Sequence, residues 1–540
     1  MFGNGLYRPY IPKEGNLVDI KVGYTSFEVF EYCDLGTTNK FTKFLVSYSR
    51  IKKKAVSYKQ GKFEFDYIPD KKFYGKRETL NGDVYWLFPI SLYPLFLDIL
   101  NDIGVPKDRI NITLNRDLKF DKLDLRFNPE INLRDYQIDY IKGYMDIRSP
   151  IGLLDMATGT GKTVTGCKLI QLLNSKVLVL IKPVYIAKWI EDIKKYFPDI
   201  QDDDICVIQG YKNLETLFRV KKEDLKYKFY ILSLVTASKY IESYEDNDLI
   251  YDTSEDLEPS NNILVGYDDG PLTITPDKFL NHIGCGVILS DEMHQHFHAL
   301  YKCLIYFNPI KTIGLTATLI SNERNMMNLY KVLLGEDGRI SDKLQIKPYC
   351  NYETINYELP NMKKFKFNSS MGYSHAEFEK SIMIKPELLE FYLDMITNIV
   401  EEDFILTRKN GDKAIIYLST IALCNIVKEH LEKVFSGISV DKYIGTDKYE
   451  KIMEADLCVT NVIKAGAALD IPNLTRVYMT IPFVSNQANL QTYGRLRKLN
   501  DRETKFVSLV CAGIDAHKAM ERTRLIQLND KILEKSSRYY

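Results

Sequence analysis

The sequence predicts an α/β protein with two parallel-sheet lobes, preceded by a small segment of mixed α+β structure. From about residue 131, short apolar runs such as KVLVLIKP and GVILSDE alternate with helical patterns. Strands that are apolar throughout are typical of parallel sheets buried on both faces. After a polar stretch, the alternation resumes with KAIIYLST, SVDKYIG, ADLCVTN, TRVYMTI and TKFVSLV. This second series indicates another unit of the same class.

These patterns give the expected domain boundaries. We expect an N-terminal α+β domain at 1–125, a first lobe at 126–345, a linker at 346–375 and a second lobe at 376–540. A chain of 540 residues is long enough for several domains. Residues 241–270 contain ten Asp or Glu and no Lys or Arg, so we expect an acidic surface insertion there, partly ordered as a hairpin.

The composition excludes some classes of protein. The longest apolar run, Val84 to Leu97, is interrupted by prolines and is shorter than the roughly 20 residues of a membrane span. The N-terminus lacks the apolar core of a signal peptide, so we expect a cytoplasmic protein without a membrane partner. The nine cysteines form no CxxC pair, which argues against a zinc ribbon.

The most specific motif is MATGTGKT, which follows an expected strand and opens an expected helix. This context is the one that a phosphate-binding P-loop requires. Gly159 and Gly161 allow the backbone to approach phosphate oxygens, with Thr158 and Thr160 in the same loop. Lys162 is expected to reach the β- and γ-phosphates of ATP, and the Thr163 hydroxyl to bind Mg²⁺.

A second motif, VILSDEMH, ends an apolar strand with two carboxylates. The carboxyl ends of parallel strands are where open α/β sheets bind ligands. We expect Asp291 to bind Mg²⁺ and Glu292 to act as the general base that polarises the attacking water. His294 is expected to couple this site to the next motif.

In this order, the motifs resemble helicase superfamily 2, in its branch with DEAH-type boxes, over about residues 131–510. GLTATL resembles the motif in which Thr316 and Thr318 would link hydrolysis to movement. LRDYQ resembles the adenine-reading element, in which Gln137 would bind the adenine edge. The resemblance implies two RecA-like lobes that hydrolyse ATP in the cleft between them.

The second lobe supplies the remaining motifs of this resemblance. VTNVIKAGAALDIPNL would place Thr460 on the nucleic-acid backbone, and Gly466 and Asp470 at the nucleotide. QTYGRLRK resembles the family's QxxGRxxR pattern, in which Arg495 would be the arginine finger. The last arginine of that pattern is Lys498 here, with Arg497 one position earlier, and the sequence leaves open which of the two fills the role.

Polar residues at strand ends are candidates for gripping a nucleic-acid backbone. They are Lys182, Pro183, Ser233, Ser419 and Thr460. Each is equally well read as a strand-end cap. Contacts of this kind imply binding that is independent of base sequence and sensitive to salt.

The motifs LRDYQ and QTYGRLRK resemble those of DNA-directed members of the superfamily: restriction-enzyme motors, the XPB group and phage branch-migration helicases of the UvsW type. The resemblance implies a DNA helicase or translocase that unwinds or remodels duplex or branched DNA, including forks and R-loops, in replication, recombination or repair. Replication or recombination proteins are possible partners. The Tyr- and Lys-rich composition suits an AT-rich genome, such as that of a phage or virus. An RNA helicase, and an ATP-gated clamp or scaffold that separates no strands, stay open as alternatives.

The N-terminal segment contrasts with the neutral net charge of the chain. From Lys40 to Arg77 there are twelve Lys or Arg and three Asp or Glu, interleaved with aromatic residues. Basic groups neutralise phosphates and aromatics can stack on unpaired bases. We predict that this segment binds DNA, with contacts from Lys52, Lys53 and Lys54. The alternative is a small β-domain with an aromatic core and solvated lysines.

Overall fold

A computed structural model describes most of the chain. The described residues are 14–48, 51–59, 62–69, 71–78, 83–157, 159–245, 274–294, 297–317, 324–341, 348–362, 365–369, 372–445, 447, 450–461, 471–499 and 501–540. For the strands at 51–69 only the backbone is described. The chain divides into two compact units: Met1–Leu319 with Glu323–Asp342, and Ile320–Asn322 with Lys343–Tyr540.

The first unit begins with a mixed sheet of five strands in the described residues, in the order β5-β6-β2-β1-β7. The strands are β1 Val18–Val22, β2 Ser26–Glu31, β5 Gly75–Glu78, β6 Val84–Pro89 and β7 Ile110–Leu114. Two helices accompany them, α1 Thr37–Val46 and α2 Tyr93–Asp102. After β7, residues 115–134 form no further strand.

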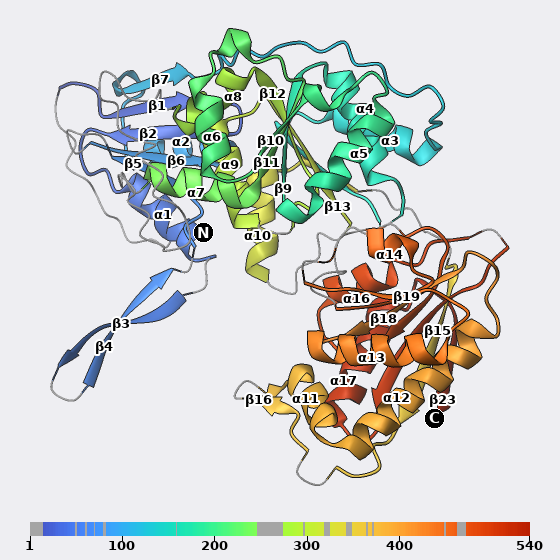
Figure 1. The fold of residues 1–540 in the computed structure, drawn as a ribbon. Coiled ribbons are helices and arrows are strands. Elements are labelled where there is room, and N and C mark those ends of the chain that lie inside the picture. The colour runs from blue at the N-terminus through green and yellow to red at the C-terminus, as the bar shows by residue number, and fades with distance from the viewer. Residues whose placement is uncertain are drawn as a thin grey trace. The chain divides into compact units, whose positions relative to one another are not determined.

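A separate antiparallel hairpin, β3 Ile51–Lys59 with β4 Lys62–Pro69, projects from this sheet (Figure 1). Its register pairs Lys52 with Ile68, Lys53 with Tyr67 and Lys54 with Asp66. The three lysines of the predicted DNA contact therefore lie on one strand of the hairpin.

The rest of the first unit is a parallel sheet, seven strands in the part described, in the order β10-β11-β9-β12-β13-β8-β14. Its strands are β8 Ile151–Asp155, β9 Lys176–Ile181, β10 Ile205–Ile208, β11 Phe229–Ser233, β12 Cys285–Ser290, β13 Lys311–Thr316 and β14 Arg339–Ser341. β9, β11 and β12 are buried along their whole length, as their apolar sequences predict.

Helices connect these strands. They are α3 Asp135–Asp146, α4 Lys162–Leu173, α5 Ile186–Tyr196, α6 Tyr211–Arg219, α7 Leu234–Glu245, α8 Pro276–Ile283, α9 Phe297–Phe307 and α10 Arg324–Leu334. The expected acidic insertion at 241–270 is wrong at its start, because 241–245 form the end of α7, where Ile241 is buried. Its remainder lies outside the described residues.

The N-terminal sheet packs on α9, the helix that follows the DE box. The hydroxyls of Thr25 and Ser26 donate to the carbonyls of Leu304 and Ile305 at 2.6 and 2.7 Å. Tyr301, also on α9, donates its hydroxyl to a carbonyl of the segment before β5. Residues 1–125 therefore fall in the same unit as the first parallel sheet. A separate N-terminal domain at 1–125 stays a prediction.

The second unit is also a parallel sheet, in the order β19-β20-β18-β21-β22-β15-β23 for its described strands. The strands are β15 Cys350–Tyr357, β18 Lys413–Leu418, β19 Val440–Tyr443, β20 Leu457–Asn461, β21 Leu474–Met479, β22 Thr504–Cys511 and β23 Ile532–Tyr539. The helices are α11 His375–Ile384, α12 Pro386–Val400, α13 Ile421–Val434, α14 Glu450–Glu454, α16 Asn486–Tyr493 and α17 Asp515–Leu528, with a short hairpin of β16 Asn368–Ser369 and β17 Gly372–Tyr373.

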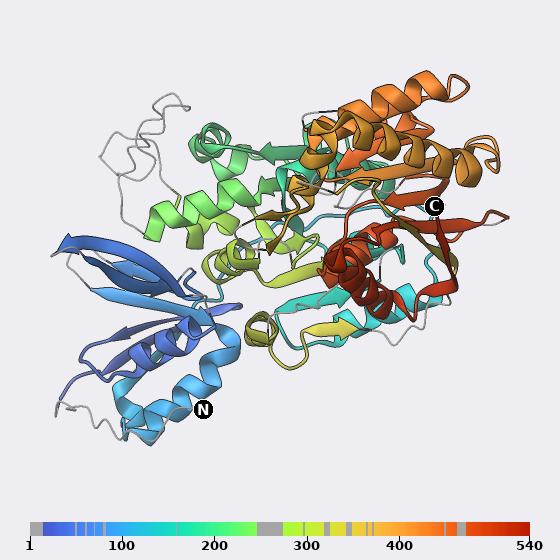
Figure 2. The same ribbon diagram turned by 90° about the horizontal axis from the view of Figure 1, so that it is seen from below.

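Helices cover both faces of this second sheet (Figure 2). Alternate residues of β18 enter two different cores: Ile416 and Leu418 pack with α12 and α13, while Ile415 and Tyr417 pack on the opposite face. The expected linker at 346–375 is wrong in part, because β15 is a strand of this sheet, paired with β22 and β23. Its sequence, CNYETINY, concealed it, since polar residues lie on both of its faces.

Candidate active site

Three motifs of the first unit meet at one edge of its sheet. The P-loop follows β8, the DE box follows β12, and Thr316 ends β13, which lies between those two strands. Because parallel strands place their carboxyl ends at a common edge, the fold brings these segments together. A backbone hydrogen bond of 2.9 Å from Met156 to the Thr316 carbonyl fixes the P-loop to the neighbouring strand.

The P-loop backbone has the conformation that its glycines allow. Gly159 and Gly161 have φ of +80° and +85°, in the left-handed region that favours glycine. A Cβ at Gly161 would lie 2.3 Å from Nε2 of Gln137, so a side chain does not fit there. Lys162 and Thr163 begin α4 directly after this turn. The backbone N–H groups of a helix start are therefore exposed to an anion at this position, and Thr158 lies outside the described residues.

Gln137 contacts the P-loop directly. Its Oε1 accepts a hydrogen bond from the Arg134 backbone N–H at 2.9 Å, and its Nε2 donates to the Thr160 carbonyl at 2.8 Å. The Tyr136 hydroxyl donates to the same carbonyl at 3.0 Å. Gln137 thus links the start of α3 to the phosphate loop, and its reading of adenine stays a prediction.

The DE box places two buried carboxylates beside the P-loop lysine. Lys162 Nζ lies 4.0 Å from Glu292 Oε1. Burial, together with the neighbouring charge of Glu292, raises the pKa of Asp291. Glu292 has a φ of +51°, unusual for a residue with a side chain. Its Oε2 is buried and has no hydrogen-bond partner among the described residues, so it can accept a proton from a bound water.

His294 makes the link to the next motif that the sequence led us to expect. Its Nδ1 lies 2.7 Å from the Thr316 hydroxyl and 3.4 Å from Glu292 Oε2. Burial, reinforced by the positive charge of Lys162, lowers the pKa of His294 to about 4. The imidazole is therefore neutral near pH 7 and relays a hydrogen bond without adding charge.

Two predicted nucleic-acid contacts of the first unit differ in accessibility. Lys182 and Pro183 follow β9, half-buried and exposed respectively. Ser233 is only 1% exposed and ends β11 inside the fold. The sequence analysis missed Trp189, which is fully buried and donates its indole N–H to Asp291 Oδ2 at 3.2 Å. One available signal was that Trp189 is one of only two tryptophans in the chain.

Of the predicted residues of the second unit, Ser419 and Thr460 lie at or next to the ends of β18 and β20, whereas Arg495 and Lys498 follow α16. Thr460 is fully buried and donates its hydroxyl to the Tyr443 carbonyl at 2.6 Å, which is the strand-end arrangement weighed as the alternative. The Ser419 N–H donates to the buried Glu379 carboxylate at 2.6 Å, a partner that the sequence did not indicate. Arg495 is buried and Lys498 is exposed. Gly466, Asp470 and Thr318 lie outside the described residues.

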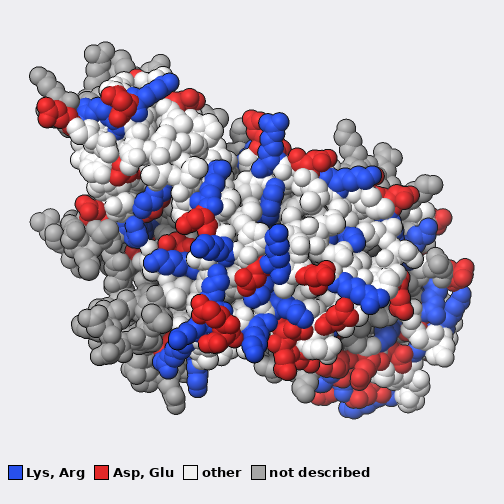
Figure 3. Space-filling model, turned by 90° about the horizontal axis from the view of Figure 1, so that it is seen from above, with Lys and Arg blue, Asp and Glu red and all other residues white. Residues whose placement is uncertain are grey.

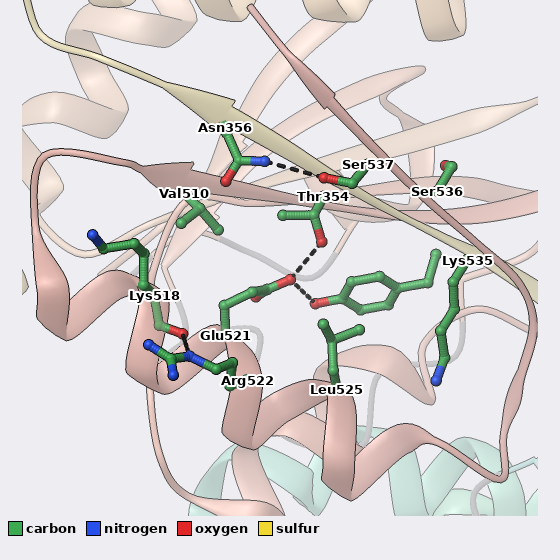
Figure 4. A pocket seen from close by; sticks show the side chains of 11 residues that line it. Thr354, Asn356, Val510, Lys518, Glu521, Arg522, Leu525, Lys535, Ser536 and Ser537 are labelled. Atoms are coloured by element: carbon green, nitrogen blue, oxygen red, sulfur yellow. Dashed lines mark hydrogen bonds between the residues drawn. The ribbon is translucent and has the colours of Figure 1, made fainter.

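A polar hollow in the second unit lies over β15 and α17, and none of the predicted residues line it (Figure 4). Its floor is the Glu521 carboxylate, which accepts hydrogen bonds from Tyr352, Thr354 and Ser508 at 2.7 to 2.8 Å. Arg524 lies 3.4 Å from the same carboxylate. These contacts satisfy the buried charge and point to a structural role for it.

Comparisons with known proteins agree with the motif series. The family model of the type III restriction enzyme res subunit matches residues 130–321, which include the P-loop and the DE box. The DNA 3'-5' translocase XPB2 of Sulfurisphaera tokodaii is 22% identical over 407 residues, 73% of this chain and 85% of the relative. This similarity extends beyond the first unit. The motif series and these two matches point to a superfamily 2 helicase.

Two further similarities were found. Transcript termination protein A18 of Yaba-like disease virus is 22% identical to this chain over 370 residues, 66% of each protein. The crystal structure of T4 UvsW aligns with 97% of this chain and 99% of its own length, at 13% identity and a TM-score of 0.32. These matches indicate an ATP-hydrolysing, nucleic-acid-dependent enzyme, and the two parallel sheets are consistent with tandem RecA-like lobes.

Proposed function

We propose that this chain is a DNA translocase that uses ATP and Mg²⁺ to unwind or remodel duplex or branched DNA, as in branch migration or the processing of forks and R-loops. The observation that supports it most is the P-loop and DE-box arrangement within a segment related to a named DNA translocase. The family model, described for a restriction enzyme subunit, also favours DNA over RNA.

The chemistry assigned to the first unit follows from its contacts. Lys162 would bind the β- and γ-phosphates, and Glu292 would accept the proton of the attacking water through its buried Oε2. Thr163 and Asp291 would hold Mg²⁺, which supplies charge neutralisation at the phosphates. Among the described residues no three His, Cys, Asp or Glu side chains converge as a metal site.

The remaining site assignments rest on the family pattern. Gln137 is proposed to read adenine, with Gly159, Thr160 and Gly161 around the phosphates. Thr158, Gly466 and Asp470 are also proposed to contact the nucleotide. Arg495 is proposed as the arginine finger, and Lys498 as the last basic position of its motif.

The proposed DNA contacts are backbone contacts. On the face shown in Figure 3, basic and acidic side chains are interspersed. The field of this face as a whole therefore does not attract phosphates, and binding depends on individual side chains. Lys182 and Pro183 are accessible enough to do so, whereas Ser233 and Thr460 would need movement of the strand ends to reach a nucleic acid. Ser419 offers its side chain while its N–H is bound to Glu379.

The β3–β4 hairpin is the proposed DNA contact of the N-terminal segment. Changing Lys52, Lys53 and Lys54 to Glu should lower the slope of log affinity against log salt by about two to three, because each phosphate contact contributes roughly 0.9. The control changes three exposed lysines elsewhere in the first unit, Lys142, Lys212 and Lys226, to Glu. Equal slopes in the two triple variants would remove the hairpin from the DNA interface.

Strand displacement distinguishes the proposal from its alternatives. We expect ATP-dependent separation or branch migration of DNA forks and four-way junctions. A chain that hydrolyses ATP on DNA without displacing strands would be a clamp or scaffold, and one that unwinds RNA alone would be an RNA helicase. Replication or recombination proteins remain proposed partners.

The source and location are also proposals. The poxviral relative favours a viral source and the cytoplasm of the host cell, whereas the resemblance of the motifs to phage branch-migration helicases favours a phage. None of the described helices combines the length and apolarity needed to cross a bilayer.

A further inference from the structure

The Trp189 indole reaches the DE box from a distant part of the sequence. Trp189 lies on α5, 102 residues from Asp291, and its Nε1 donates to Asp291 Oδ2 at 3.2 Å. It is among the largest fully buried side chains in the described residues. None of the roles proposed above uses this contact.

The hydrogen bond restricts the Asp291 carboxylate. An indole has a single polar atom, a donor, and a buried donor needs an acceptor. Here the acceptor is a carboxylate oxygen, which makes the hydrogen bond stronger than one between neutral groups. The other oxygen, Oδ1, accepts the Glu292 backbone N–H at 2.9 Å. Each oxygen thus has one protein donor, so the plane of the carboxylate is fixed while lone pairs stay available to a cation.

The core of the first unit fixes the position of the donor. Ile186, Trp189 and Ile193 are buried at helical spacing on one face of α5. The same helix packs against α4, which begins with Lys162 and Thr163. The indole N–H is therefore held in place before any nucleotide binds, as a preorganised partner of a metal ligand should be.

We propose that Trp189 is a positioning residue that orients the Asp291 carboxylate toward Mg²⁺. The inference rests on the proposed ATP and Mg²⁺ chemistry of this edge. Trp189→Phe keeps an aromatic ring in the core but removes the donor. Loss of such a supporting hydrogen bond typically weakens metal affinity or activity about 10- to 100-fold.

The test measures Mg²⁺ binding apart from turnover. A non-hydrolysable ATP analogue is added at saturation, Mg²⁺ is titrated, and the midpoint of the rise in melting temperature is recorded. We expect this midpoint to move to about 10-fold higher Mg²⁺ or more in Trp189→Phe. The analogue should bind equally well to wild type and variant without Mg²⁺. Ile193→Val, a core change on the same face of α5, is the control and should keep the wild-type midpoint.

A second measurement uses a chain with Trp189 intact. Trp86 and Trp189 are the two tryptophans, so Trp86→Phe leaves Trp189 as the reporter. Its emission should change during the Mg²⁺ titration with the midpoint found by melting. Unchanged emission, or a Trp189→Phe midpoint equal to that of Ile193→Val, overturns the inference while the ATPase assignment stands. A wild-type chain without any Mg²⁺-dependent stabilisation overturns the proposed function and this inference with it.

Discussion

The buried ion pair between Lys302 and Glu245 connects the N-terminal segment to the first lobe, and we expect it to contribute to the free energy of unfolding of the first unit. Lys302 Nζ lies 2.5 Å from Glu245 Oε1 and 2.5 Å from the Tyr74 carbonyl of the N-terminal segment. The Tyr306 hydroxyl donates to the same carboxylate oxygen at 2.6 Å. The two charged side chains are 6% and 18% exposed. The Glu245 carboxylate therefore joins the end of α7 to α9, and Lys302 joins α9 to the N-terminal segment.

Removing one charge of this pair should lower the free energy of unfolding of the first unit. Breaking a buried pair by removing one partner costs about 3–5 kcal/mol, because the other charge stays buried without compensation. We expect Glu245→Gln to cost about 3 kcal/mol or more, since Lys302 is the more buried partner. Lys302→Met should cost less, because Glu245 keeps Tyr306 and some water. The double variant should lose less than the sum of the two, since it contains no uncompensated charge.

Urea unfolding followed by tryptophan emission measures these free energies. Trp86 and Trp189 both lie in the first unit, so their emission follows that unit. Asp202→Asn, which breaks the exposed pair with Lys194, is the control and should cost no more than about 1 kcal/mol. If the losses of the two single variants add up to that of the double variant, or if Glu245→Gln loses as little as the control, the buried pair does not stabilise the first unit in this way.

The remaining predictions concern chemistry and pH. Lys162→Ala should abolish most ATP turnover, and Glu292→Gln should trap bound ATP; wild-type rates in both would exclude the assigned site. Arg495→Ala should lower kcat by about 10³ while nucleotide binding survives, so a normal kcat would place it outside the reaction. Gln137→Ala should raise KM for ATP more than for GTP, and an unchanged ratio would count against adenine reading. Burial and neighbouring positive charge lower the pKa of His517 to about 2, so only the unfolded chain gains its proton below about pH 6.5. The second unit should therefore lose about 1.4 kcal/mol per pH unit on acidification below that pH, and an unaltered slope of unfolding free energy against pH in His517→Gln would contradict this.

The sequence predicted the elements that are locally distinctive. The P-loop was predictable because strand, glycine turn and helix are consecutive, and the buried strands because they are apolar throughout. β23 was missed because its sequence, ILEKSSRY, is polar and exposed at the edge of the sheet. β15 was missed because Glu353 interrupts it, and that charge is compensated only in the fold, by Lys505 and Arg538.

Contacts between distant residues could not be predicted in the same way. The Trp189–Asp291 hydrogen bond and the Glu379 contact to the Ser419 N–H join residues 102 and 40 positions apart. No local pattern marks such partners, because a buried tryptophan or glutamate has the same sequence signal whatever it contacts. The Lys302–Glu245 pair is hidden for the same reason.

The most direct test of the central claim is the rate of Mg²⁺-dependent ATP hydrolysis with single-stranded DNA, duplex, forks, four-way junctions and RNA of matched length. We expect a low basal rate that DNA raises several-fold or more and that branched DNA raises most, and we expect Lys162→Ala to abolish hydrolysis with every substrate. A rate that no nucleic acid changes, or that RNA alone stimulates, would contradict it.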